Sequence, residues 1–64
     1  MKHMNDFEDF VQMEAICTYL RSFGYKAKVN NNILSVEVQD LDASTKTICR
    51  WETAREFIKV RAES

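Results

Sequence analysis

Glycine, proline and histidine are nearly missing from this chain: it holds one glycine, no proline and one histidine in 64 residues. A single glycine excludes the glycine-rich loops that cradle phosphates in nucleotide-binding motifs. The only histidine, His3, lies in the opening MKHM, and His-Met is a common cloning scar, so residues 1–4 carry no functional argument. Without another histidine, neither cysteine has a base to activate it as a nucleophile. We therefore expect no enzymatic activity.

Cysteine is also scarce, since the chain has only Cys17 and Cys49. Secreted domains of this length that rely on disulfides usually carry four or more cysteines. Both cysteines lie within apolar, periodic segments, so we expect reduced core residues in a cytoplasmic protein. Together with His3 they show neither CxxC nor HxxxH spacing, and we expect no metal and no cofactor.

Long apolar runs and an excess of either charge are absent too. Nine Lys plus Arg oppose ten Asp plus Glu, so net charge favours neither nucleic acid nor an acidic membrane surface. No apolar run approaches the ~20 residues of a membrane span, and no signal peptide is recognisable. Residues 1–64 form one small domain, which buries only about 60% of its unfolded surface. Such domains usually need a staple, and with disulfides and metal excluded we expect a homodimer.

The first half of the chain predicts a helix over residues 6–23, followed by a hairpin. The inward stripe of this helix has helical spacing and consists of Phe10, Met13, Ile16, Cys17, Leu20 and Phe23. Asn5 and Glu8 resemble a capping box at its start. Gly24 suits the left-handed position after a helix, from which Tyr25 can fold back on the last turn.

The apolar period then changes from 3.6 to 2, which indicates strands over residues 25–29 and 34–38. Between them lie Asn30, Asn31 and Asn32. Asparagine tolerates positive φ better than any residue except glycine, so these three residues predict a tight turn.

The second half of the chain has two interpretations. Residues 45–51 are rich in β-branched and aromatic side chains, which favours a third strand with Thr47, Cys49 and Trp51 on one face and Lys46, Ile48 and Arg50 on the other. A capping box at Thr53 and Glu56 then predicts a helix from Ala54 to about Ala62. Its inward side consists of Ala54, Phe57, Ile58 and Arg61. The alternative is a single helix from Ala43 to the C-terminus, which must ignore that cap.

The favoured interpretation gives an α+β fold in the order α-β-β-β-α. Its three strands form an antiparallel meander, and both helices pack on one face of the sheet. The other face is left open to water or to a partner.

The open face is the first candidate site. The alternation predicts that Lys26, Lys28, Lys46 and Arg50 share it, opposed only by Glu37. A flat basic face can receive a phosphate backbone, which suggests a nucleic-acid-binding domain. Exposed lysines on strands also deter aggregation and keep a chain soluble, with no binding role.

The function that we favour is a small, non-enzymatic protein–protein interaction module: an adaptor, regulator or inhibitor of bacterial or phage type. Its candidate interface is Trp51 with Thr45 and Thr47, because an edge strand can pair with a symmetry mate into one sheet of six strands. Trp51 suits either a lid over the first helix or an interface anchor. Phe7, Val11 and Tyr19 widen the apolar band of that helix and either complete the core or form a dimer patch.

Overall fold

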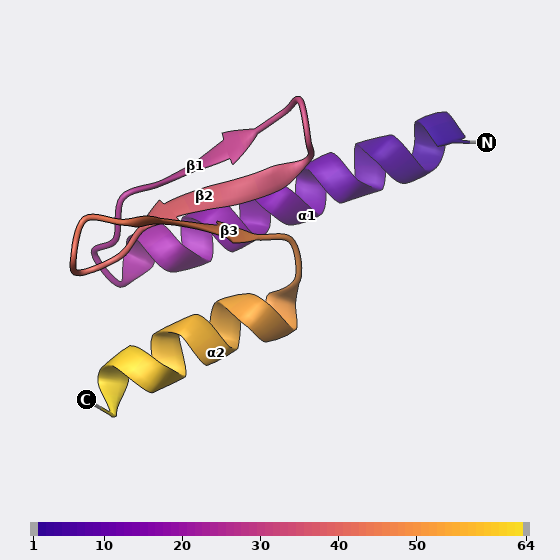
Figure 1. Ribbon diagram of the computed structural model, residues 1–64. Coiled ribbons are helices and arrows are strands. Elements are labelled where there is room, and N and C mark those ends of the chain that lie inside the picture. The colour runs from indigo at the N-terminus through magenta and orange to yellow at the C-terminus, as the bar shows by residue number, and fades with distance from the viewer. Residues whose placement is uncertain (1, 64) are drawn as a thin grey trace.

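The computed structural model of this chain describes residues 2–63, with side chains described from residue 8 onward. Figure 1 shows two helices and a three-stranded sheet, which in chain order are α1 (Lys2–Ser22), β1 (Ala27–Asn30), β2 (Ser35–Gln39), β3 (Thr45–Ile48) and α2 (Trp51–Ala62). The sheet is antiparallel throughout, with the strand order β1-β2-β3. The predicted α+β meander is confirmed, and so is a third strand in place of one long C-terminal helix.

Helix α1 contributes the largest share of the core. Four positions of the predicted stripe are buried, namely Met13, Ile16, Cys17 and Leu20. Phe10 and Phe23, at the two ends of the stripe, are 36% and 53% exposed, so their predicted burial is wrong. The stripe is longer than the sheet it covers: in Figure 1 the first half of α1 projects beyond the strands.

Strand register places the other half of the core on one face of the sheet. Val36 pairs with both Val29 and Ile48, and Val38 pairs with Ala27. Directly paired residues share a face, and this face is covered by α1 and by two buried residues of α2, Ala54 and Phe57. Both helices therefore pack on the same side of the sheet, as the sequence predicts.

Helix α2 begins at Trp51, three residues earlier than predicted. Arg50 is its N-cap and makes no side-chain capping bond, so the predicted capping box at Thr53 and Glu56 lies inside the helix and is wrong. The predicted box at Asn5 and Glu8 is wrong for the same reason, because α1 already begins at Lys2. In both cases the helix begins before the locally favourable start.

In both hairpin turns, the residue with positive φ is of a type that does not favour this conformation. The first turn spans residues 31–34, and its positive φ of 48° belongs to Leu34 rather than to an asparagine. Asn30 instead ends β1 and accepts a hydrogen bond from the Asn32 amide at 3.0 Å, an Asx turn. The second turn places Ala43 at φ 74°. Gly24, at φ 94°, confirms the predicted left-handed end of α1.

Aromatic contacts join the helices to each other and to the sheet. Trp51 is half-buried and packs edge-on against Tyr19 of α1, with ring centroids 5.4 Å apart, as its interpretation as a lid over the first helix predicts. Tyr25 packs edge-on against Phe57 of α2, with ring centroids 5.1 Å apart. Of the two helices in the described range, neither has the length and apolar character needed to cross a membrane.

Candidate functional site

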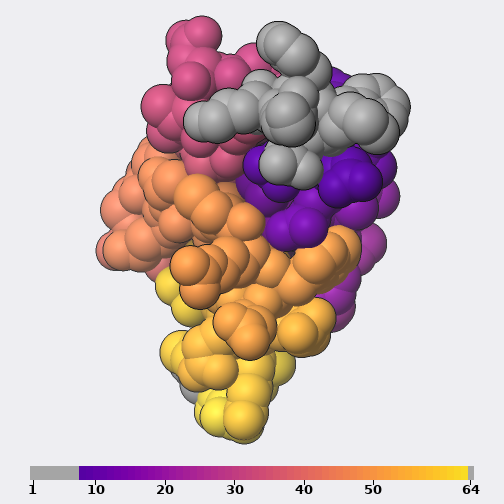
Figure 2. All heavy atoms as spheres, turned by 90° about the vertical axis from the view of Figure 1, so that its right-hand side faces the viewer, coloured from indigo at the N-terminus to yellow at the C-terminus, as the bar shows by residue number. Residues whose placement is uncertain are grey.

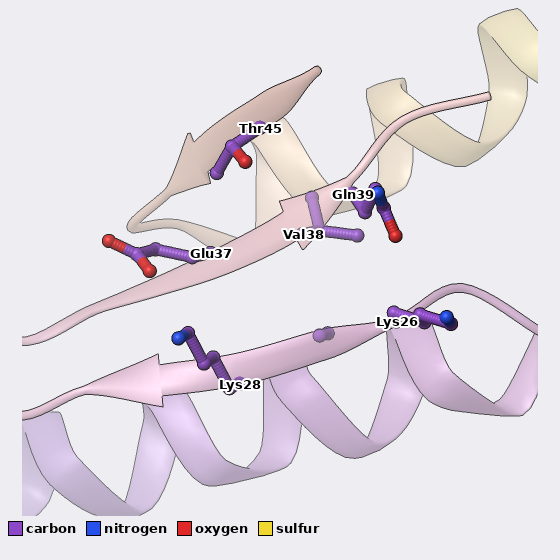
Figure 3. Close-up of a pocket in the computed structure, with 7 residues that line it drawn as sticks. Lys26, Lys28, Glu37, Val38, Gln39 and Thr45 are labelled. Atoms are coloured by element: carbon purple, nitrogen blue, oxygen red, sulfur yellow. The ribbon is translucent and has the colours of Figure 1, made fainter. Parts of the chain in front are cut away.

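The open face of the sheet presents polar side chains. Lys28 is paired with Glu37, and Glu37 with Thr47, so these three form one row across the strands. Figure 3 shows a pocket of about 260 Å³ lined by both lysines of the β1 segment, Lys26 and Lys28, together with Glu37. A carboxylate therefore lies among the cations that we expected to form a basic face.

The four predicted cations do not share this face. Lys46 is paired with Val38, which is fully buried, so the Lys46 side chain leaves β3 on the helix-covered side. Arg50 lies beyond the end of β3 and caps α2. The alternation predicted for residues 45–51 is wrong by one position: Ile48 is buried and Cys49 is exposed. Strand β3 ends at Ile48 and Trp51 is the first residue of α2, so the strand alternation does not extend to Cys49 and Trp51.

The β1 edge of the sheet is covered by a side chain. The Gln39 amide donates to the Lys26 carbonyl at 2.9 Å, and bonding pairs in an antiparallel ladder occur at every second residue. By this alternation, the main-chain groups of Ala27 and Val29 point away from β2. The Arg21 guanidinium donates from Nε to the Ala27 carbonyl at 2.8 Å, which occupies one of the outward acceptors.

At the β3 edge, main-chain groups also point outward, but no side chain is bonded to them among the described residues. The Asp40 amide donates to the Ser44 carbonyl at 2.7 Å, and this pair continues the register of β2 with β3. Lys46 and Ile48 therefore bond to β2, while the amides and carbonyls of Thr45 and Thr47 point outward. Among the hydrogen bonds of the described side chains, none reaches these outward groups. This edge is a template for pairing with another chain.

A groove of about 560 Å³ separates β3 from α2. On the strand side it is lined by Lys46, Thr47 and Ile48. Successive strand side chains point to opposite faces, so a groove lined by three consecutive residues follows the edge of the strand rather than one face. The helix side consists of Glu52, Thr53, Glu56, Phe57, Val60 and Arg61.

An ion pair fixes one end of this groove. Arg61 donates from Nε to Asp40 Oδ1 at 2.9 Å and makes a second bond to Oδ2. Its guanidinium also donates to the Phe57 carbonyl and stacks 3.6 Å from the centroid of the Phe57 ring. Hydrogen bonding from Arg61 lowers the pKa of Asp40 to about 2. The contact ties the end of α2 to the turn that precedes β3, so α2 runs back along that strand.

The two cysteines lie in different environments. Burial raises the pKa of the Cys17 thiol, which disfavours the nucleophilic thiolate. Cys49 is exposed, contrary to the predicted core position. Over the residues that the structure describes, no three His, Cys, Asp or Glu side chains gather in a metal-binding arrangement.

The groove between β3 and α2 was not predicted from the sequence. Val60 is 46% exposed although it lies one turn after buried Phe57, and the predicted inward stripe of this helix did not include it. The separation of α2 from β3 depends on tertiary packing, and no local pattern indicates it.

Comparisons with protein-family models, with curated proteins and with solved structures find no match for this chain. The function proposed below therefore depends on residues and geometry alone.

Proposed function

We propose that this chain is a non-catalytic protein-binding module that acts through the groove between β3 and α2. One observation carries the proposal: an uncovered strand edge borders a groove with an apolar floor. Ile48 and Phe57 are buried in that floor, and Val60 extends it to the surface at 46% exposure. Exposed apolar surface beside unpaired main-chain groups is typical of protein-interaction sites.

A matched pair of variants tests this function. Val60→Gln makes the groove polar, while Val11→Gln makes the same change on α1, where the valine is 50% exposed. Affinity capture with the full chain should recover the same proteins with wild type and with Val11→Gln, and lose them with Val60→Gln. Capture that is equally strong with both variants would place the binding surface elsewhere and reject the proposal.

The predicted homodimer is a second use of the same edge. Thr45 and Thr47 are exposed on β3 and present outward main-chain groups, which is what strand pairing between two copies requires. Sedimentation equilibrium measures the mass. A dimer that dissociates on Thr47→Pro assigns the edge to self-association, whereas a monomer at all concentrations rejects the homodimer.

Nucleic-acid binding has less support. Of the four cations expected on the open face, Lys46 lies on the other face of the sheet and Arg50 is the N-cap of α2. The acidic residue Glu37 lies on the open face, on the central strand β2. A gel-shift titration at about 50 mM salt tests it, because phosphate contacts are strongest at low ionic strength.

We also propose a cytoplasmic location. Cys17 and Cys49 are both free thiols, and Cys49 is exposed. Free exposed thiols persist in reducing compartments. Thiol labelling of the protein in intact cells, with and without an oxidant, tests this location.

A further inference from the structure

The free edge of β3 determines the form that a ligand must take. Thr45 and Thr47 present outward amides and carbonyls in the phase fixed by the Asp40–Ser44 bond. An extended chain offers free amides and carbonyls of its own to both kinds of group, whereas a helix uses these groups internally. An extended strand fits and a helix does not.

The spacing of α2 suits such a strand. The groove-lining residues Glu52, Glu56 and Val60 succeed one another every four residues, a rise of about 6 Å. Side chains on one face of a strand recur every ~6.6 Å. Because α2 runs back along β3, each second side chain of an added strand meets the next turn of the helix (Figure 1).

Charge gives the groove a direction. Glu52 and Glu56 lie in the first half of α2, with Glu52 beside the Ile48 end of β3, and neither forms an ion pair among the described residues. At the other end Arg61 is neutralised by Asp40, and Val60 precedes Arg61 on α2. Lys46 lies only two residues from Ile48, so the groove is acidic at the Ile48 end, has Lys46 and Phe57 in its middle and is apolar at the Val60 end.

We propose that this groove binds an extended segment of another protein, which adds to β3 as an antiparallel strand. Read from its N-terminus, the segment carries a basic side chain and, four positions later, an apolar side chain. The basic residue meets Glu52 and the apolar residue packs on Val60. This inference rests on the proposed function and specifies its ligand.

The antiparallel direction follows from the stability of the two ladders. Antiparallel pairing is slightly more stable per residue than parallel pairing. With four residues in β3, the bound segment spans about four or five residues, or roughly 13 to 17 Å.

Selection from a phage-displayed library of random twelve-residue peptides, with the full chain as bait, tests the inference. We expect enriched sequences with the basic–x–x–x–apolar pattern. A synthetic peptide, acetyl-Thr-Lys-Thr-Thr-Thr-Val-Thr-amide, and its matched control with Lys and Val exchanged then measure direction. We expect the control to bind at least about tenfold more weakly, which is about 1.4 kcal/mol.

Thr47→Pro tests the strand mode, since it removes an outward amide that no ladder bond uses. We expect the first peptide to shift the amide resonances of Thr45 and Glu52 in wild type, and to lose at least about tenfold in affinity with Thr47→Pro. Equal affinity of the two peptides, or equal binding to Thr47→Pro, overturns the inference.

The outcomes separate the inference from the proposed function. Enriched peptides that bind Thr47→Pro but not Val60→Gln keep the groove as a binding site and reject strand addition. A homodimer that occupies the β3 edge likewise keeps the interaction module and rejects a foreign segment. Enriched peptides that bind Val60→Gln as well as wild type, or no enrichment at all, reject both.

Discussion

The two edges of the sheet have the same backbone geometry and different surroundings. At β1, outward main-chain groups lie beside α1, and Arg21 donates a hydrogen bond to the Ala27 carbonyl. At β3, the equivalent groups of Thr45 and Thr47 border a groove. Figure 2 shows α2 below the strands and α1. A charged side chain at an edge protects it from pairing, so β3 is the less protected of the two edges.

The largest expected effect tests whether α1 rather than α2 holds the sheet. Leu20 is fully buried, so Leu20→Ala should lower the free energy of unfolding by about 2–5 kcal/mol. Ile58→Ala on α2 should cost about 1 kcal/mol, because that side chain is only half-buried. Urea denaturation followed by circular dichroism compares them. Equal losses of unfolding free energy would contradict a larger contribution of α1 than of α2 to the stability of the fold.

Proline substitutions at two neighbouring positions test which amides of β3 bond to β2 and which point outward. The Lys46 amide bonds to β2, so Lys46→Pro should cost more than about 1 kcal/mol. The Thr47 amide points outward, and Thr47→Pro should change stability by less than about 0.5 kcal/mol. Thermal unfolding of the two variants decides between them. If Thr47→Pro proves the more damaging, the assignment of the free edge is wrong.

Removal of the β1 cover should make the two edges more alike. Arg21→Met keeps most of the apolar stem and deletes the bond to the Ala27 carbonyl, at a cost of about 1 kcal/mol. We also expect concentration-dependent association through the newly exposed edge, measured by sedimentation velocity. Glu14→Gln, on the same helix and exposed, is the control and should leave the protein's mass unchanged.

The smallest effect appears only in acid and concerns the end of the groove. The folded pKa of Asp40 is lowered to about 2 by Arg61, below the unfolded value of about 3.9. Its stabilising contribution is therefore full above about pH 4 and is lost as pH falls towards 2. Asp40→Asn should flatten this part of the stability curve. Urea unfolding at several pH values measures it, and unchanged acid sensitivity in Asp40→Asn would assign the effect to other carboxylates.

Periodicity predicts the elements of this fold well and their boundaries less well. The change of apolar period at Tyr25 correctly located the first hairpin, and β-branching correctly predicted β3. The capping signals at Asn5 and Thr53 failed because both helices begin before these residues. Local chemistry thus predicts an element more reliably than its ends.

The predicted site failed for a different reason. The predicted alternation ran through residue 51, but the chain is already helical there. Ile48 is buried and pairs with buried Val36, which fixes the phase of β3. The groove itself depends on where α2 lies relative to β3, and such a distance is set by the whole core rather than by any local motif.

The scarcity of glycine has a thermodynamic consequence in the hairpin turns. Leu34 and Ala43 both hold positive φ with a β-carbon present, a conformation that costs about 1–2 kcal/mol per residue for L-amino acids. Glycine at these positions should therefore raise the free energy of unfolding. Ala43→Gly should raise the melting temperature by several degrees. Such a variant would offer a sturdier scaffold into which other peptide specificities can be engineered.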